Sequence, residues 1–169
     1  MKRGGWIRTP VGFGKLNVDA SFDHDLLKST ARAVLRNDKG NFIARVTWKI
    51  DHCVDALTAE AWALIFGLSL AQHAGCNCFV INSDNLEVIE TMNNGGQSAG
   101  ASAAIFDDCY FLACDLPTSS FEYCNREANK VAQELAWFAR FSATVDWFEE
   151  PMIEIVPFLT NNVFVILVE

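Results

Sequence analysis

Residues 55–92 contain the feature that most restricts how this chain can fold. Between Glu60 and Asp84 the sequence holds no Asp, Glu, Lys or Arg, and apolar residues dominate the interval. Gly75 divides it into a helical part and a short strand-like part. A charge beside such a segment is costly unless it is paired, exposed or bound to a metal. The two carboxylates at its ends therefore indicate a site.

The composition favours one globular domain of ordinary type. The 169 residues are enough for a substantial core, and 51% are hydrophobic against 20% charged. A net charge of −8 argues against a generic basic nucleic-acid binder, because phosphate contacts need clustered Lys and Arg. It does not argue against a site that meets phosphate through metal ions.

The six cysteines lack the paired Cys-x-x-Cys spacing of a zinc site. We therefore expect reduced, mostly buried thiols in a cytoplasmic or nuclear protein. The N-terminus shows no apolar stretch of a secretion signal. The longest apolar run, residues 61–71, is shorter than the about 20 residues of a membrane span, so no membrane partner is expected. The oligomeric state stays open.

Hydrophobic periodicity predicts an α/β protein with a mixed sheet, in the order β-β-β-α-β-α-α-β-α. Residues 15–22 alternate apolar and polar, which places Asp19 on the polar face of a strand. Asn37–Gly40 predicts a hairpin turn, and Gly75 the end of the first helix. The predicted strands are 15–22, 31–36, 41–50, 78–82 and 120–124, the predicted helices are 56–74, 85–92, 102–114 and 126–141, and residues 23–29 are predicted to form a polar turn.

Five segments carry a family resemblance: LNVDASF, AVLRNDKGNF, LTAEAWALIFGLSLAQHAG, FVINSDNLEVIETM and REANKVAQELAWFAR. In this order and spacing they resemble the ribonuclease H-like superfamily, and especially its plant reverse-transcriptase-associated domains, which are retroelement-derived. The resemblance spans roughly residues 15–160. It implies a ribonuclease H-like fold: a five-stranded mixed sheet with helices on both faces. We expect a lead-in or linker at 1–14, the domain at 15–143 and a C-terminal extension at 144–169.

The resemblance also implies an activity, which is hydrolysis of the RNA strand of RNA–DNA hybrids with two Mg²⁺ (or Mn²⁺) ions. The family's catalytic and metal-binding carboxylates map onto Asp19, Glu60 and Asp84. The chemistry agrees, since Mg²⁺ prefers hard oxygen ligands. Two such ions about 3.5–4 Å apart can stabilise the attacking and the leaving oxygen of an in-line displacement.

The sequence departs from the family pattern at three positions. The expected fourth carboxylate is Gln133, which has no anionic oxygen, and the neighbouring Glu134 is rotated by about 100° around the helix. Arg32 and Ala20 stand where the family often has Gly. These departures support an alternative: a catalytically weak or inactive module of the same fold, domesticated from a retroelement, that binds nucleic acid or protein.

Each carboxylate also has a simpler explanation that the sequence leaves open. Asp19 could be a solvated residue on a strand face. Glu60 could lie in the first turn of its helix, where acids interact favourably with the helix dipole. Asp84 could cap the helix that follows it.

An RNA–DNA hybrid or other nucleic acid is the expected partner. Candidate contacts to it are Asn17 and Ser21 on the polar face of the first strand, and Arg126 and Asn129 on the last helix. For the two helix residues, a solvated helix face is the simpler explanation.

Overall fold

The computed structural model describes residues 9–129 except residues 41, 76 and 117. It confirms the α/β class and the predicted order of elements as far as the fifth strand. The last predicted helix begins at Arg126, residues 126–129 are helical, and residues 130–141 lie outside the described residues. The elements are β1 (Gly14–Asp23), β2 (Lys28–Arg36), β3 (Phe42–Ile50), α1 (Ala56–His73), β4 (Phe79–Ser83), α2 (Leu86–Asn93), α3 (Ala103–Cys114) and β5 (Ser120–Tyr123).

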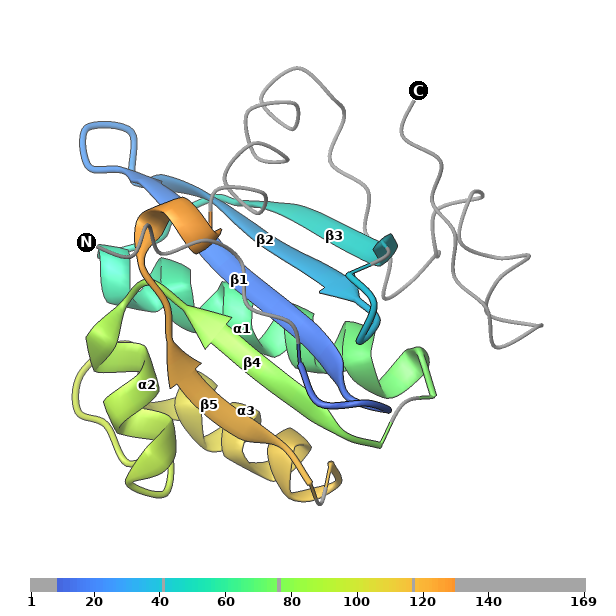
Figure 1. The fold of residues 1–169 in the computed structure, drawn as a ribbon. Helices are drawn as coiled ribbons and strands as arrows, with labels where there is room; N and C mark the ends of the chain where they lie inside the picture. Colours follow the sequence, from blue (N-terminus) through green and yellow to red (C-terminus); the bar gives the residue numbers. More distant parts are fainter. Residues whose placement is uncertain (1–8, 41, 76, 117, 130–169) are drawn as a thin grey trace, which may run out of the picture.

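The strands form one mixed sheet in the order β3-β2-β1-β4-β5 (Figure 1). β1, β2 and β3 are an antiparallel meander. β4 joins the other side of β1 in parallel, and β5 joins β4 in parallel. This is the five-stranded mixed sheet that the resemblance implied. β1 is the central strand and belongs to both the antiparallel and the parallel part.

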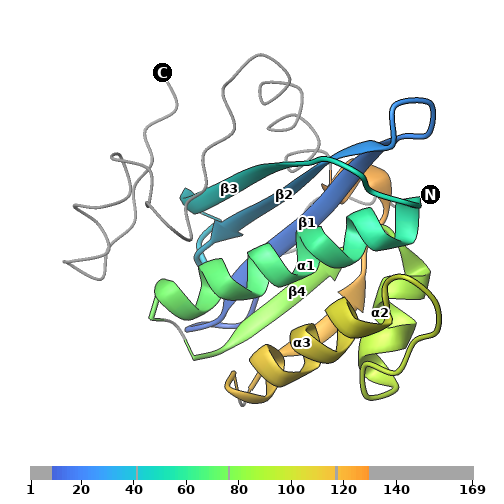
Figure 2. The ribbon, with the colours of Figure 1, turned by 180° about the vertical axis from the view of Figure 1, so that it is seen from behind.

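Helices lie on both sides of the sheet. α1 and α3 pack against each other on one face, which the view from behind shows in front of the strands (Figure 2). The helical residues 126–129 lie on the opposite side, beside β1 (Figures 1 and 2). Asn129 ties this segment to the strand, because its side-chain amide donates to the Val18 carbonyl at 2.9 Å.

α1 packs closely against β1 and β2 because Gly67 has no side chain. A Cβ at this position would lie 2.7 Å from Val18 Cγ1 and 3.2 Å from Ala33 Cβ. Gly67 follows Glu60 by seven residues, which is about two helical turns. The close contact at Gly67 therefore also fixes the position of Glu60 relative to β1. The largest fully buried side chains of the described residues are Phe79, Phe106, Leu16, Leu35, Leu64, Leu68, Leu70, Ile81, Val18, Val34 and Val88.

Two predicted turns are confirmed. Gly75 follows the end of α1 with φ +70°, a conformation that glycine adopts without strain, and its N–H donates to the Gln72 carbonyl at 3.2 Å. Gly40 closes the turn between β2 and β3 with φ +84°, and its N–H donates to the Asn37 carbonyl at 2.9 Å.

The turn between β1 and β2 is shorter than the predicted 23–29. β1 continues to Asp23, and β2 already begins at Lys28. The Asp23 carboxylate accepts hydrogen bonds from the backbone N–H groups of Asp25 and Leu26, both at 3.0 Å. A side chain that mimics a backbone turn in this way allows the strands to pair almost to the loop.

Within the described residues, no helix combines the length and the apolar character that a membrane crossing requires. The domain boundaries near residues 14 and 143 stay predictions, because residues 1–8 and 130–169 lie outside the described part of the chain. The predicted fourth position, Gln133, lies there too.

Candidate active site

Three carboxylates from three elements meet at one place. Asp19 belongs to β1, Glu60 is the fifth residue of α1, and Asp84 directly follows β4. One ligand oxygen from each lies within 4.8 Å of the others. β1 and β4 are parallel neighbours, with Asn17 paired to Asn82, so both strands deliver an aspartate at the same end of the sheet. We call Asp19, Glu60 and Asp84 the triad.

The simpler explanations of these carboxylates do not hold in the structure. Asp19 is buried rather than solvated. The first turn of α1 contains no acid, and Glu60 lies beyond it; the helix is capped by Asp55, whose side chain accepts from the Thr58 N–H at 2.7 Å. α2 is capped by Asn85 and not by Asp84.

Burial and mutual repulsion make it costly to ionise the triad. Burial raises the pKa of Glu60 to about 9, and the charges of Asp19 and Asp84 add to the rise. Burial, followed by the charge of Asp84, raises the pKa of Asp19 to about 6, although Arg32 opposes this shift. A cation placed among the three groups would reverse this balance, because it favours the charged forms.

The residues present fit a divalent cation. Glu60 Oε2 is buried and has no hydrogen-bond partner among the described residues, so one carboxyl oxygen is left available inside the protein. All three side chains offer hard carboxylate oxygens, which suit Mg²⁺ or Mn²⁺ better than softer metals. Asp19, Glu60 and Asp84 could therefore hold such an ion together.

Two arginines contact the triad in different ways. Arg32 lies directly opposite Asp19 across β1 and β2, with Nη1 3.0 Å from Asp19 Oδ2, and both side chains are buried. Arg126 Nε lies 3.8 Å from Asp84 Oδ2, but the Arg126 side chain is 87% exposed. The sequence marks Arg32 only as a departure from the family pattern, and its contact with Asp19 is missed there because it depends on the strand register.

Asn17 and Asn129, two of the predicted nucleic-acid contacts, bind each other. The Asn17 amide donates to Asn129 Oδ1 at 3.1 Å, and Asn129 donates in turn to the Val18 carbonyl. Asn129 is fully buried and Asn17 nearly so. These amides therefore join the start of the last helix to β1 and are not presented to a nucleic acid. Arg126 and Ser21 remain the candidates with accessible side chains.

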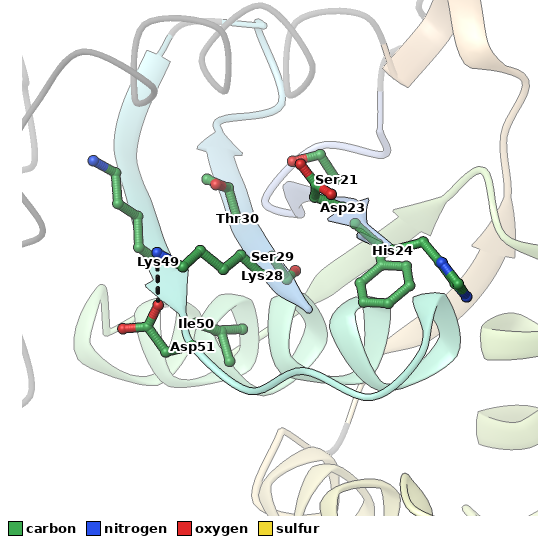
Figure 3. A pocket seen from close by; sticks show the side chains of 10 residues that line it. Ser21, Asp23, His24, Lys28, Ser29, Thr30, Lys49, Ile50 and Asp51 are labelled. Carbon is green, nitrogen blue, oxygen red and sulfur yellow. Dashed lines mark ion pairs between the residues drawn. The ribbon is translucent and has the colours of Figure 1, made fainter. Parts of the chain in front are cut away.

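A cavity of about 760 Å³ lies near the triad, at the end of the sheet where β1 connects to β2 (Figure 3). Ser21 and Thr30 line it, and each is two residues from the Asp19–Arg32 pair on the same sheet face. This spacing corresponds to about 7 Å along the strands. Lys28 forms an ion pair with Asp51, which neutralises part of the lysine charge (Figure 3). The cavity thus has mixed charge and adjoins the triad without belonging to it.

The comparisons with known proteins agree with this geometry. A family model described as "Reverse transcriptase-like" matches residues 17–139. The chain belongs to this family. The reverse transcriptase-like domain is ribonuclease H-like, as the five sequence segments indicated. No curated protein sequence matches the chain. An association with plant retroelements stays a prediction.

Solved structures share the fold at low sequence identity. The ribonuclease H1 of the halophilic archaeon Halobacterium salinarum is 18% identical, with a TM-score of 0.67 over 72% of this chain and 92% of that one. The N-terminal ribonuclease H domain of a Mycobacterium tuberculosis protein is 20% identical, with a TM-score of 0.68 over 75% and 91%. LC11-RNase H1 in complex with an RNA/DNA hybrid is 19% identical, with a TM-score of 0.65 over 72% and 92%.

Proposed function

We propose that this reverse transcriptase-like domain is a metal-dependent ribonuclease that hydrolyses the RNA strand of RNA–DNA hybrids. The observation that carries the proposal is the triad, whose ligand oxygens lie within 4.8 Å of one another on a ribonuclease H-like fold. The RNA/DNA hybrid bound to the structurally similar LC11-RNase H1 supports the substrate class.

Two Mg²⁺ or Mn²⁺ ions at the triad would stabilise the attacking and the leaving oxygen at the scissile phosphate. Asp19 and Asp84 would hold them from the ends of two parallel strands, and Glu60 from α1. The exposed Arg126 beside Asp84 would meet a phosphate of the bound strand. Because the chain has a net charge of −8, we expect hybrid binding to be weak without the ions.

A second candidate function is binding of nucleic acid or protein without turnover. The buried contact between Arg32 and Asp19 favours it, because a guanidinium already neutralises one of the three carboxylates. Gln133 favours it as well, since an amide supplies no fourth anionic ligand. Under this alternative, the domain keeps the fold and the triad but cleaves slowly or not at all.

Cleavage of a labelled RNA–DNA hybrid in Mg²⁺ or Mn²⁺ separates the two functions. The variants are Asp19→Asn, which removes one triad charge, and Gln133→Asp, which supplies the missing carboxylate. Asp107→Asn is the matched control, because Asp107 is an exposed acid on α3 outside the triad. The proposal expects cleavage by the unmodified chain and by Asp107→Asn, and a loss of about 10²-fold or more in Asp19→Asn, the size expected when one strong transition-state contact is removed.

Silence from the unmodified chain with cleavage by Gln133→Asp would favour the second function on an otherwise intact site. Silence from all variants would reject the nuclease. Equal cleavage by Asp19→Asn and the unmodified chain would show that the triad is not the active site.

A further inference from the structure

Arg32 is an unusual residue for the middle of a strand. It is flanked by Ala31 and Ala33, which are fully buried, and its own side chain is only 6% exposed. Arginine is almost never buried unless its charge is paired. The pairing here is with Asp19, from Nη1 to Oδ2 at 3.0 Å. A buried cation has therefore been placed beside the triad.

The register of the sheet fixes this cation in place. Asp19 and Arg32 are direct cross-strand partners in the antiparallel pair of β1 and β2. Arg126 also approaches the triad, but it lies at 3.8 Å from Asp84 and its side chain is 87% exposed. Water screens Arg126 and lets it move away, whereas Arg32 is enclosed by protein. Arg32 is thus the permanent counter-charge of the three carboxylates.

The guanidinium and a divalent cation compete for the same charge. Asp19 Oδ2 accepts from Arg32, and an oxygen of Asp19 is also one of the three that could hold an ion. Two cations on one carboxylate repel each other, and this repulsion is strong where water is excluded. An ion can enter the triad only against this repulsion or after the guanidinium has turned away from Asp19.

We propose that Arg32 is a built-in counter-cation that keeps the metal-free triad folded and lowers its affinity for divalent ions. This inference rests on the proposed function, because it assumes that the triad takes up a metal. Arg32 is a positioning residue in this scheme: it acts on the ion through Asp19 and does not touch the substrate. The domain would accordingly be folded at low metal concentration and become loaded only at high concentration.

Titration of the full chain with Mn²⁺ alone tests the inference without any activity measurement. Calorimetry gives the dissociation constant, and thermal unfolding gives the melting temperature with and without Mn²⁺. Arg32→Gln removes the charge and keeps a polar side chain; Arg32→Met removes it and keeps an unbranched one. Arg45→Gln is the matched control, since it removes an arginine from the same sheet face, where Arg45 pairs with Val34 on β2.

We expect both Arg32 variants to bind Mn²⁺ about tenfold or more tightly than the unmodified chain, which corresponds to about 1.4 kcal/mol. Their melting temperature without Mn²⁺ should fall, and the rise that Mn²⁺ produces should be larger. Arg45→Gln should behave as the unmodified chain. Should the Arg32 variants be unfolded without metal, Mn²⁺ must restore their folded state, and failure to do so overturns the inference.

An Asp19→Asn titration distinguishes the ways in which the inference can fail. If the unmodified chain binds Mn²⁺ as tightly as the Arg32 variants, and Asp19→Asn abolishes binding, the counter-cation role is overturned and the metal site stands. If neither the unmodified chain nor the Arg32 variants bind Mn²⁺, the metal-dependent function fails and the inference fails with it.

Discussion

One ion pair joins β1 to β2 and another joins β2 to the residue after β3, and the two pairs differ mainly in their exposure to solvent. Arg32 lies 3.0 Å from Asp19, and the two side chains are 6% and 8% exposed. Lys28 lies 3.6 Å from Asp51, and these side chains are 61% and 70% exposed. Each cation also has a further acid nearby, because Asp23 is the cross-strand partner of Lys28 and the other triad members adjoin Asp19.

The difference shows that exposure to water, more than the identity of the two charged groups, determines how much an ion pair affects stability. Exposed charges keep their hydration, and water screens them, so their pairing contributes little. Buried charges have lost their hydration, and each depends on its partner. The Arg32–Asp19 pair therefore controls the triad, whereas the Lys28–Asp51 pair should hardly affect the rest of the molecule.

Removing Arg32 should produce the larger change in stability of the two ion-pair cations. In Arg32→Met without metal at pH 8, Asp19 is left as a buried, unpaired carboxylate, and we expect the free energy of unfolding to fall by about 3–5 kcal/mol. At pH 5 the loss should be smaller, because the pKa of Asp19 is about 6 even with Arg32 in place and rises further without it, so that a proton replaces the missing cation. Urea unfolding in EDTA at both pH values measures this. A loss below about 1 kcal/mol at pH 8 would show that this buried pair contributes no more to stability than an exposed ion pair does.

The stability of the metal-free protein should also depend on pH, because two buried acids of the triad have raised pKa values. The pKa of Asp19 is raised from 3.8 to about 6, and that of Glu60 from 4.5 to about 9. Between these values the folded state holds protons that the unfolded state has released, so stability is greatest at low pH and falls as pH rises. The slope should reach about 1.4 kcal/mol per pH unit for each proton.

Urea unfolding in EDTA between pH 5 and pH 9 measures this fall. Glu60→Gln is the control, because it removes the group responsible for the decrease toward pH 9 and should leave only the part near pH 6. A stability that stays level or rises over this range would contradict the raised pKa values.

Removing Lys28 should produce the smallest change. Lys28→Met breaks the exposed contact with Asp51, and we expect the free energy of unfolding to change by about 0–1 kcal/mol, with less effect at high salt. The same urea experiment at low and high salt checks it. A loss as large as that of Arg32→Met would remove the distinction between the two pairs.

Much of the fold could be predicted because its signals are local. Apolar alternation marked β1, an uncharged apolar interval marked α1 and β4, and glycines marked their ends. The triad residues were identified by their place at the borders of these segments and by the family resemblance. The structure then brought all three together.

The Arg32–Asp19 contact could not be predicted because it depends on which residues of β1 and β2 pair with each other. A turn at 23–29 is centred on residue 26 and would place Ala33 opposite Asp19, whereas the shorter turn places Arg32 there. A shift of one residue moves every side chain to the other face of the sheet. Asp23 carried the missing signal, since an aspartate that accepts from the next N–H groups favours a tight turn.

The central place of β1 also bears on how the protein is made. Of the five strands of the sheet, β1 is translated first, and its pairing with β2 and β3 is local enough to form early. Its other edge has to wait for β4, since Gly14 pairs with Phe79 only after the whole of α1 has been translated. During that interval a nascent chain presents an unpaired strand edge, which other chains can extend. The segment that carries Asp19 is thus exposed to misassembly during synthesis.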